Sequence, residues 1–306
     1  MSRCKAAVLA IALVFSAAGG TSRADEITAV YSAYWAGLPA AEIRLKLRGG
    51  KIAYDDEVEI RTEGLPRLVS HFDGTARATG RIVADRAAEP ARYDALFDLR
   101  KRRNNRVSMR FIARGDAIVA ERGADDTSRK PPLAEAFRRS AVDPLTAVER
   151  LRQAIAAGAG AANRNFSIPV YDGARRFDVL ARVLPKKDPA DGLVRIALSL
   201  HPIAGFKGES SDVGDPDDAP RPVALTLTDD PLLLPTSIMV RVFSLPLVVR
   251  LDYFCAASAP CQKSASWIGP PLPITPAAAA QRHSSRRFGE SSGLLTGGGR
   301  YAQAGW

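Results

Sequence analysis

Apolar and polar residues alternate along most of this chain, and that alternation limits the folds open to it. From Ile27 to Trp35 every second residue is apolar, and the pattern returns at 41–47 with charged residues between the apolar ones. A side-chain period of two is typical of a strand with one buried face. The turn between them, around Gly37, is short enough to require antiparallel pairing, so the two segments predict a hairpin.

The same pattern extends through most of residues 25–252. In the first half it predicts strands at 51–62, 75–83, 91–99, 106–113 and 117–121, and in the second half at 166–171, 175–184, 193–200, 222–228, 233–242 and 247–252. Each is short, with one apolar face and one charged face. We therefore expect a mainly β protein whose curved antiparallel sheet closes around its apolar face as a barrel or half-barrel.

One helix is expected to interrupt the strands. Asp143 suits an N-cap, Pro144 suits the first helical position, and apolar residues then recur at helical spacing from Leu145 to Ile155 before Gly158. Its position leaves open whether the strands form one sheet or two sub-sheets that divide near residues 140–165.

Residues 1–24 have the order of a secretory signal peptide. Arg3 and Lys5 precede an apolar run over 6–18, and small residues at Ser22 and Ala24 follow it. That run of about a dozen residues is shorter than the roughly 20 that a membrane-spanning helix needs. We expect cleavage after Ala24, export to the periplasm, and a mature β domain over 25–252.

Two cysteines remain after the predicted cleavage, Cys255 and Cys261. An exported protein meets oxidising conditions, so a local disulfide is the simplest prediction. It would close a short loop and contribute about 2 kcal/mol. No further ligand lies close to the pair in the sequence, so we predict no metal site.

The last segment, 253–306, differs in composition from the rest. Beyond Gly269 it is rich in Pro, Ala, Ser and Gly, which predicts a disordered tail. The chain carries a formal charge of +10, and much of the excess after cleavage lies in this basic tail. Because export is predicted, we expect no nucleic-acid partner.

A second basic cluster lies at the turn between two predicted strands and comprises Arg100, Lys101, Arg102 and Arg103. These side chains could contact an anionic lipid surface or an acidic partner. They could equally be solvated charges that protect a sheet edge from pairing with other chains. The sequence leaves both interpretations open.

No motif in the chain specifies a reaction. The sequence has no H-E-x-x-H pair, no G-x-S-x-G elbow, and no phosphate-binding or dinucleotide-binding glycine loop. We therefore assign no catalytic residue, no cofactor and no metal ligand.

Five segments together resemble a known family. They are AVYSAYWAGLPAAEIRLKL, RTEGLPRLVSHFDGTARATG, DPLTAVERLR, VYDGARRFDV and IAGF, in that order within 27–252. This succession is similar to the exported bacterial family of domain of unknown function 3108. The resemblance implies an envelope protein with a curved antiparallel sheet of the kind seen in lipoprotein carriers. The family has no assigned activity, so no site residue can be carried over. The long tail and the late cysteines depart from the family pattern.

The function that follows is a hypothesis with alternatives. We expect a non-enzymatic envelope protein whose sheet binds an apolar ligand such as a lipid, or serves as a docking surface. Tyr31, Tyr34, Trp35 and Phe97 are the candidates for a ligand cradle. One alternative is an envelope hydrolase that uses carboxylates such as Glu57, Asp94 and Asp98, since glycoside hydrolysis needs two carboxylates at a defined separation. The other is a structural module of an envelope complex.

Overall fold

The computed structural model describes most of the chain between residues 25 and 264. The described residues are 25–50, 52–64, 67, 72–83, 87–99, 102–127, 131–159, 164–186, 188–206, 220–242, 244–256 and 260–264. The expected signal peptide and most of the expected tail lie outside them. Both expectations stay predictions.

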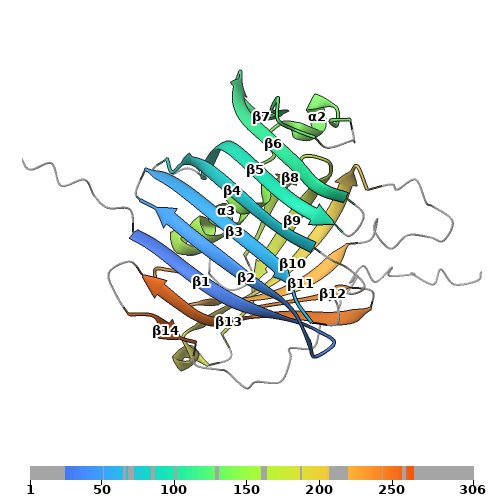
Figure 1. Ribbon diagram of the computed structural model, residues 1–306. Coiled ribbons are helices and arrows are strands. Elements are labelled where there is room, and N and C mark those ends of the chain that lie inside the picture. The colour runs from blue at the N-terminus through green and yellow to red at the C-terminus, as the bar shows by residue number, and fades with distance from the viewer. Residues whose placement is uncertain are drawn as a thin grey trace, which may run out of the picture. The chain divides into compact units, whose positions relative to one another are not determined.

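The described part is mainly β, as the alternation predicted, with short helices (Figure 1). The strands of the first half are β1 (Asp25–Trp35), β2 (Leu38–Gly49), β3 (Ala53–Thr62), β4 (Phe72–Arg81), β5 (Glu89–Leu99), β6 (Arg102–Arg114) and β7 (Ala117–Arg122). The helical segments are α2 (Glu135–Arg138), α3 (Pro144–Ala154), a π turn at Ile155–Ala159 and a 3₁₀ turn at Pro189–Asp191. The strands of the second half are β8 (Asn165–Tyr171), β9 (Arg176–Val183), β10 (Leu193–Ala204), β11 (Arg221–Thr228), β12 (Pro235–Val242), β13 (Leu245–Ala256) and β14 (Gln262–Lys263).

All these strands belong to one antiparallel sheet. Its order is β7-β6-β5-β4-β3-β2-β1-β13-β12-β11-β10-β9-β8, and β14 pairs with β13. Each half of the chain is a meander, and the two halves meet where β13 pairs with β1 from Ile27–Ala256 to Trp35–Leu247. The first and last long strands therefore lie side by side at the middle of the sheet.

The two outer strands, β7 and β8, are joined by the segment that leads into α3. Ser140 N donates to Ile118 O at 2.7 Å on the β7 side. On the β8 side, Val142 N donates to Pro169 O and Tyr171 N donates to Val142 O, at 2.9 and 2.8 Å. This segment makes the sheet nearly closed, which confirms the barrel-like fold expected from the sequence.

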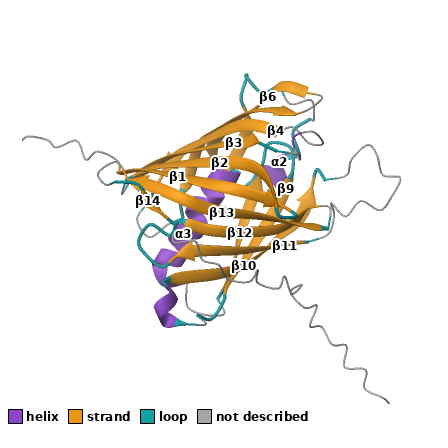
Figure 2. Ribbon diagram, turned by 60° about the horizontal axis from the view of Figure 1, so that its bottom comes forward, coloured by secondary structure: helices purple, strands orange, loops and turns teal. Residues whose placement is uncertain are grey.

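Helix α3 lies inside the curve of the sheet (Figure 2). Asp143 caps it as predicted, since its Oδ1 accepts from Leu145 N and Thr146 N at 3.0 and 2.9 Å. Thr146 Oγ1 donates to Asp143 Oδ2 at 2.5 Å and lies 2.7 Å from the hydroxyl of Tyr54 on β3. With its own proton directed to Asp143, Thr146 accepts from Tyr54, so the cap is bonded directly to the sheet.

Further bonds fix the rest of the helix. Arg150 Nε donates to Ala88 O at 2.9 Å, and Ala88 N donates to Gln153 Oε1 at 2.7 Å. Arg152 donates to Leu232 O at 2.7 and 3.2 Å. These bonds hold α3 between the β4–β5 connection and the β11–β12 connection, which lie at the same end of the sheet.

Apolar packing buries the inner face around α3. Leu145 packs in one cluster with Tyr93 and Met109, and Leu151 packs in another with Val170 and Ile196. Gly80 on β4 leaves the room that Tyr54 needs, because a Cβ at residue 80 would lie 2.3 Å from the Tyr54 hydroxyl oxygen. The helix therefore forms the core at this end of the barrel, which we call the helix end.

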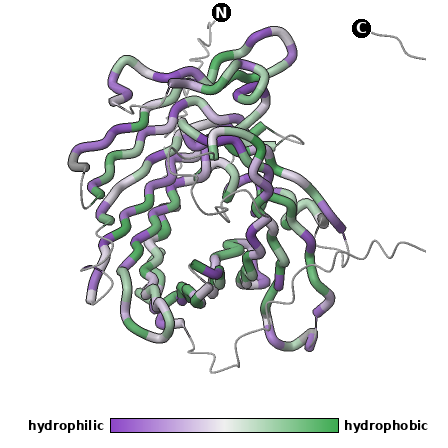
Figure 3. Tube along the Cα trace, turned by 90° about the vertical axis from the view of Figure 1, so that its right-hand side faces the viewer, coloured by the Kyte–Doolittle hydropathy of each residue, from purple (hydrophilic) through white to green (hydrophobic). Residues whose placement is uncertain are grey.

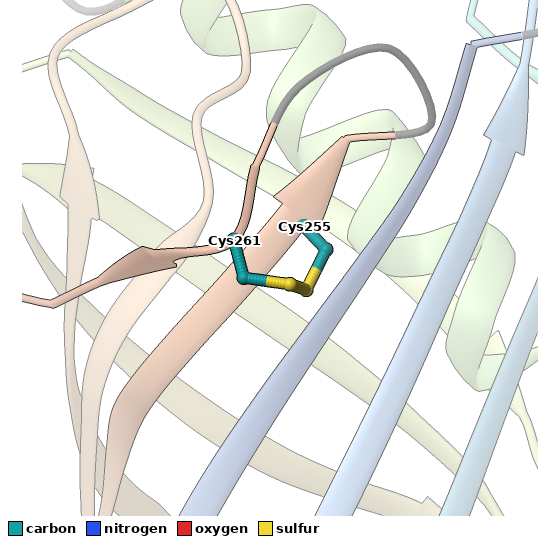
Figure 4. The surroundings of a disulfide bond; sticks show 2 residues. All are labelled: Cys255 and Cys261. Carbon is teal, nitrogen blue, oxygen red and sulfur yellow. A yellow bond between two sulfur atoms is a disulfide. The ribbon is translucent and has the colours of Figure 1, made fainter.

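The strands continue beyond Asp252, where the sequence suggested that the tail begins. Strand β13 runs through Ala256, and Tyr253 and Phe254 pair with Lys263 and Gln262 of β14. Alternation in this stretch is short and includes two cysteines, so it resembled the tail. The predicted disulfide between Cys255 and Cys261 is confirmed and links β13 to the residues before β14 (Figure 4).

Reducing this disulfide should weaken the fold only modestly. The double variant Cys255→Ser/Cys261→Ser should lose about 2 kcal/mol of unfolding free energy, since the bond closes a short loop. Urea denaturation followed by circular dichroism measures the change. A loss of the whole native far-UV spectrum would contradict a role confined to the end of β13.

Candidate functional site

The inner face of the sheet differs in burial between its two ends. At the helix end its side chains are buried; they include Leu47, Ala78, Tyr93, Met109, Ile168, Val183, Ile196 and Leu227. At the other end, where β1 turns into β2 and β12 turns into β13, most inner side chains are apolar and only partly buried, although Ala33 and Val249 are buried there. We call this the mouth end, and its partly buried inner residues the mouth band: Ala41, Ile43, Ile60, Phe97, Phe177, Val179, Leu198, Ile238 and Leu247.

Helix length explains the difference. Helix α3 has 11 residues and spans about 16 Å at 1.5 Å per residue. Strands such as β2, with 12 residues, span about 40 Å at 3.3 Å per residue. Even aligned with the strands, α3 would cover less than half of their length. Helix α3 is therefore too short to cover the inner face along its whole length.

The mouth band continues around the curve of the sheet. Ile43, Ile60 and Phe97 lie in one cross-strand row, since Ile43 pairs with Ile60, Ile60 with Gly74, and Gly74 with Phe97. Phe97 stacks on Phe72 with ring centroids 6.1 Å apart. The view in Figure 3, with the right-hand side of Figure 1 facing the reader, shows hydrophobic residues recurring along the strand traces.

The structure separates the four predicted cradle residues. Phe97 belongs to the mouth band, and Trp35 lies at its rim, where its Nε1 donates to Val242 O at 3.3 Å. Tyr31 also faces inward but is buried deeper, with 3% of its surface exposed. Tyr34 pairs with Val248, between the inward residues Leu247 and Val249, and so lies on the outer face. The alternation of residues along β1 is enough to place Tyr34 on the face opposite to Tyr31 and Trp35.

A polar group that the sequence analysis did not single out lies behind the mouth band. It consists of Tyr31 on β1, Asp56 on β3, and Glu149 and Arg152 on α3. Asp56 is 4% exposed, Glu149 is buried, and Glu149 Oε2 accepts from Arg152 Nη1 at 2.8 Å. The Tyr31 hydroxyl is buried without a hydrogen-bond partner. We call these four residues the buried polar group.

Burial changes the acidity of this group. It raises the pKa of Asp56 from 3.8 to about 7, and the nearby Glu149 carboxylate raises it further, while Arg152 acts in the opposite direction. Burial also raises the pKa of the Tyr31 phenol, which Arg152 partly offsets. The proton of Asp56 would therefore exchange near neutral pH.

A sequence signal for this group existed. The apolar positions of β3 are Tyr54, Val58 and Ile60, and Asp56 interrupts that series on the same face. A carboxylate at an inward position is costly unless it is paired or protonated, which makes the interruption informative. Glu149 gave a weaker signal, because its bonded partner Arg152 is a neighbour on the same helix and Asp56, whose pKa it raises, lies on a strand distant in the sequence.

The outer face carries the charges that the alternation predicted. Glu57, one of the three carboxylates considered for hydrolysis, lies within 3.3 Å of Lys46 and 3.4 Å of Arg48. Burial acts to raise the pKa of Asp94, but hydrogen bonds from Arg92 and Ser108 outweigh it and lower that pKa. Asp98 accepts from Asn104 N at 2.6 Å. A general acid needs a raised pKa, so Asp94 is unsuited to that role.

The basic cluster is only partly described. Arg100 and Lys101 lie outside the described residues, and Arg102 and Arg103 begin β6, although their side chains are not described. Their contact with an anionic surface stays a prediction. Within the described residues, no cluster of three His, Cys, Asp or Glu side chains could hold a metal ion. None of the described helices has the length and apolar character to cross a bilayer.

Comparison with known proteins gives a family. The model of the family described as "Protein of unknown function (DUF3108)" matches residues 30–192, more than half of the chain. The chain belongs to the DUF3108 family. The resemblance stated from the sequence is confirmed.

Among solved structures, this DUF3108 chain is similar to a beta-barrel-like protein of domain of unknown function DUF1849 from Brucella abortus. The two share 11% identity, with a TM-score of 0.49, over 78% of this chain and 100% of the other. No curated protein matches the sequence. The DUF3108 match runs from Val30 within β1 to beyond β9, and it includes α3, Asp56 and Glu149.

The raised pKa of Asp56 predicts a pH dependence. Folded Asp56 keeps its proton up to about pH 7 whereas the unfolded residue loses it near 3.8, so its contribution to stability is complete below pH 3.8 and is lost as the pH rises toward 7. Relative to Asp56→Asn, the unfolding free energy of the wild type should fall over this range, each pKa unit corresponding to about 1.4 kcal/mol. Urea denaturation at several pH values measures this difference.

Asp55→Asn is the matched control. Asp55 is the preceding residue on β3 and is bonded to Arg77 on the outer face at 2.6 Å. Because Asp55→Asn keeps Asp56, the unfolding free energy of the wild type relative to Asp55→Asn should not fall between pH 4 and 7. Parallel curves for the wild type and Asp56→Asn would show that Asp56 is not protonated in the folded protein.

Proposed function

We propose that this protein binds an apolar ligand, such as a lipid or another molecule with an acyl chain, against the mouth band. The observation that carries the proposal is the uneven burial of the inner face. Apolar side chains on β2, β3, β5, β9, β10, β12 and β13 face the interior and stay partly exposed where α3 does not reach.

The energy of burial supports an apolar ligand. Covering apolar surface contributes about 25 cal/mol per Å², or about 0.8 kcal/mol for each methylene group of a chain. An acyl chain along the mouth band would remove water from both partners. The buried polar group lies deeper and could meet a polar end of the ligand, since the Tyr31 hydroxyl has no partner of its own.

Export to the periplasm is part of the proposal. Strand β1 begins at Asp25, directly after the expected cleavage position. The Cys255–Cys261 disulfide suits an oxidising compartment. Sequencing the N-terminus of the protein from the periplasmic fraction should find Asp25 first. An intact Met1 in that fraction would exclude cleavage.

Charge in the mouth band should prevent binding. Phe97→Lys on β5 and Val179→Lys on β9 each place an ammonium group on the inner surface, where an apolar ligand would have to desolvate it. We expect each variant to bind a fluorescent fatty acid at least about tenfold more weakly, since tenfold corresponds to only about 1.4 kcal/mol. Fluorescence titration measures the dissociation constants.

The preceding or following residue on each strand gives a matched control. Leu96 and Leu180 are 41% and 39% exposed on the outer face, next to Phe97 and Val179. Leu96→Lys and Leu180→Lys should bind the fatty acid as the wild type does. Equal weakening by inner and outer substitutions would point to a general loss of stability. Failure of the wild type to bind, with no lipid found by native mass spectrometry, would reject the proposal.

A further inference from the structure

Two hairpin tips lie side by side at the mouth end. Strand β1 turns into β2 at Ala36 and Gly37, and β12 turns into β13 before Leu245 (Figure 1). The backbones of the two tips are joined, because Ala36 N donates to Pro246 O at 2.8 Å. Trp35 pairs with Leu247 at the base of both tips. The tips therefore form one local surface.

Large apolar side chains on these tips point to solvent. Leu38 is 48% exposed and Leu245 is 42% exposed, and Pro39 and Pro246 beside them are also exposed. We call these four residues the tip surface. The Trp35 ring lies partly exposed at its base, with its indole N–H bonded to Val242 O. An apolar tip above a hydrogen-bonded indole is the arrangement found at membrane–water interfaces.

A cationic side chain lies next to the tip surface on its β12–β13 side. Residues 33–41 and 231–251 contain no Asp or Glu. Arg241 is exposed and pairs across the β12–β13 hairpin with Pro246, so it lies at the edge of the tip surface. Phosphate groups are natural partners for arginine because a guanidinium can bind them in a bidentate manner.

We propose that the tip surface docks onto a phospholipid bilayer, with Leu38 and Leu245 entering the acyl boundary and Arg241 bonded to headgroup phosphates. Stable protein interfaces bury about 1,200 Å² or more, and two prolines and two leucines on narrow turns offer much less. A bilayer needs no complementary shape, so it suits two small apolar projections.

In this proposal Arg241 bonds to individual headgroup phosphates, and a net negative charge of the membrane is not required. Two acidic residues lie close to the tip surface, because Glu63 N donates to Ala40 O at 2.8 Å and Glu42 follows Ala41 on β2. Their carboxylates would oppose attraction to a strongly anionic surface. Zwitterionic phospholipid carries the same phosphate without net charge, so we expect binding to it as well.

The experiment is co-sedimentation of the mature chain with large vesicles of phosphatidylcholine, alone or with one quarter phosphatidylglycerol. The wild type should sediment with both. The double variant Leu38→Ser/Leu245→Ser should bind at least about tenfold more weakly, because it removes both apolar anchors. Arg241→Ser should bind several-fold more weakly to both compositions.

Leu180→Ser is the control, since Leu180 is similarly exposed but lies on the outer face of β9. It should sediment as the wild type does. Circular dichroism of all variants checks that they fold, and fatty-acid titration checks the mouth band separately. Wild-type binding by Leu38→Ser/Leu245→Ser, or no sedimentation of the wild type with either vesicle, would overturn this inference without affecting the proposed ligand site. If the wild type sediments with vesicles but does not bind the fatty acid, the proposed ligand site is rejected and the membrane contact stands.

Discussion

The attachment of α3 to the inside of the sheet determines the arrangement of the rest of the molecule. Tyr54 donates to Thr146, Thr146 donates to Asp143, and Asp143 caps the helix, so one series of bonds joins β3 to the start of α3. An isolated helix of this length is marginal in water. Its stability depends on the surrounding strands, and the strands at the helix end depend on it for their core.

This attachment divides the interior into two chemically distinct parts. Around α3 the inner side chains are buried, burial raises the pKa of Asp56 to about 7, and the Tyr31 hydroxyl is left without a hydrogen-bond partner. Toward the mouth end the same strands continue without a helix against them, and their apolar side chains stay partly exposed. The proposed ligand site and the proposed membrane contact lie at this end. A ligand taken from a bilayer would then have a short path into the barrel.

Much of the fold could be predicted from the sequence because alternation is a local signal. The hairpin 27–47, the N-cap Asp143 and the disulfide required only neighbouring residues. The pairing of β1 with β13 and the position of α3 inside the sheet could not be predicted, since both depend on bonds between residues more than 60 positions apart. The ligand cradle was predicted only in part for a different reason. The four aromatic residues were selected by residue type, although the alternation in β1 already places Tyr34 on the face opposite to Tyr31 and Trp35.

Hydrogen exchange of the α3 backbone amides tests the central claim most directly. If the helix is held inside the sheet, the amides of 147–154 should exchange about as slowly as those of β3 and β8, which surround it. Exchange of these amides at the rate of an unstructured peptide, while the strands stay protected, would show that α3 does not form the core of the barrel.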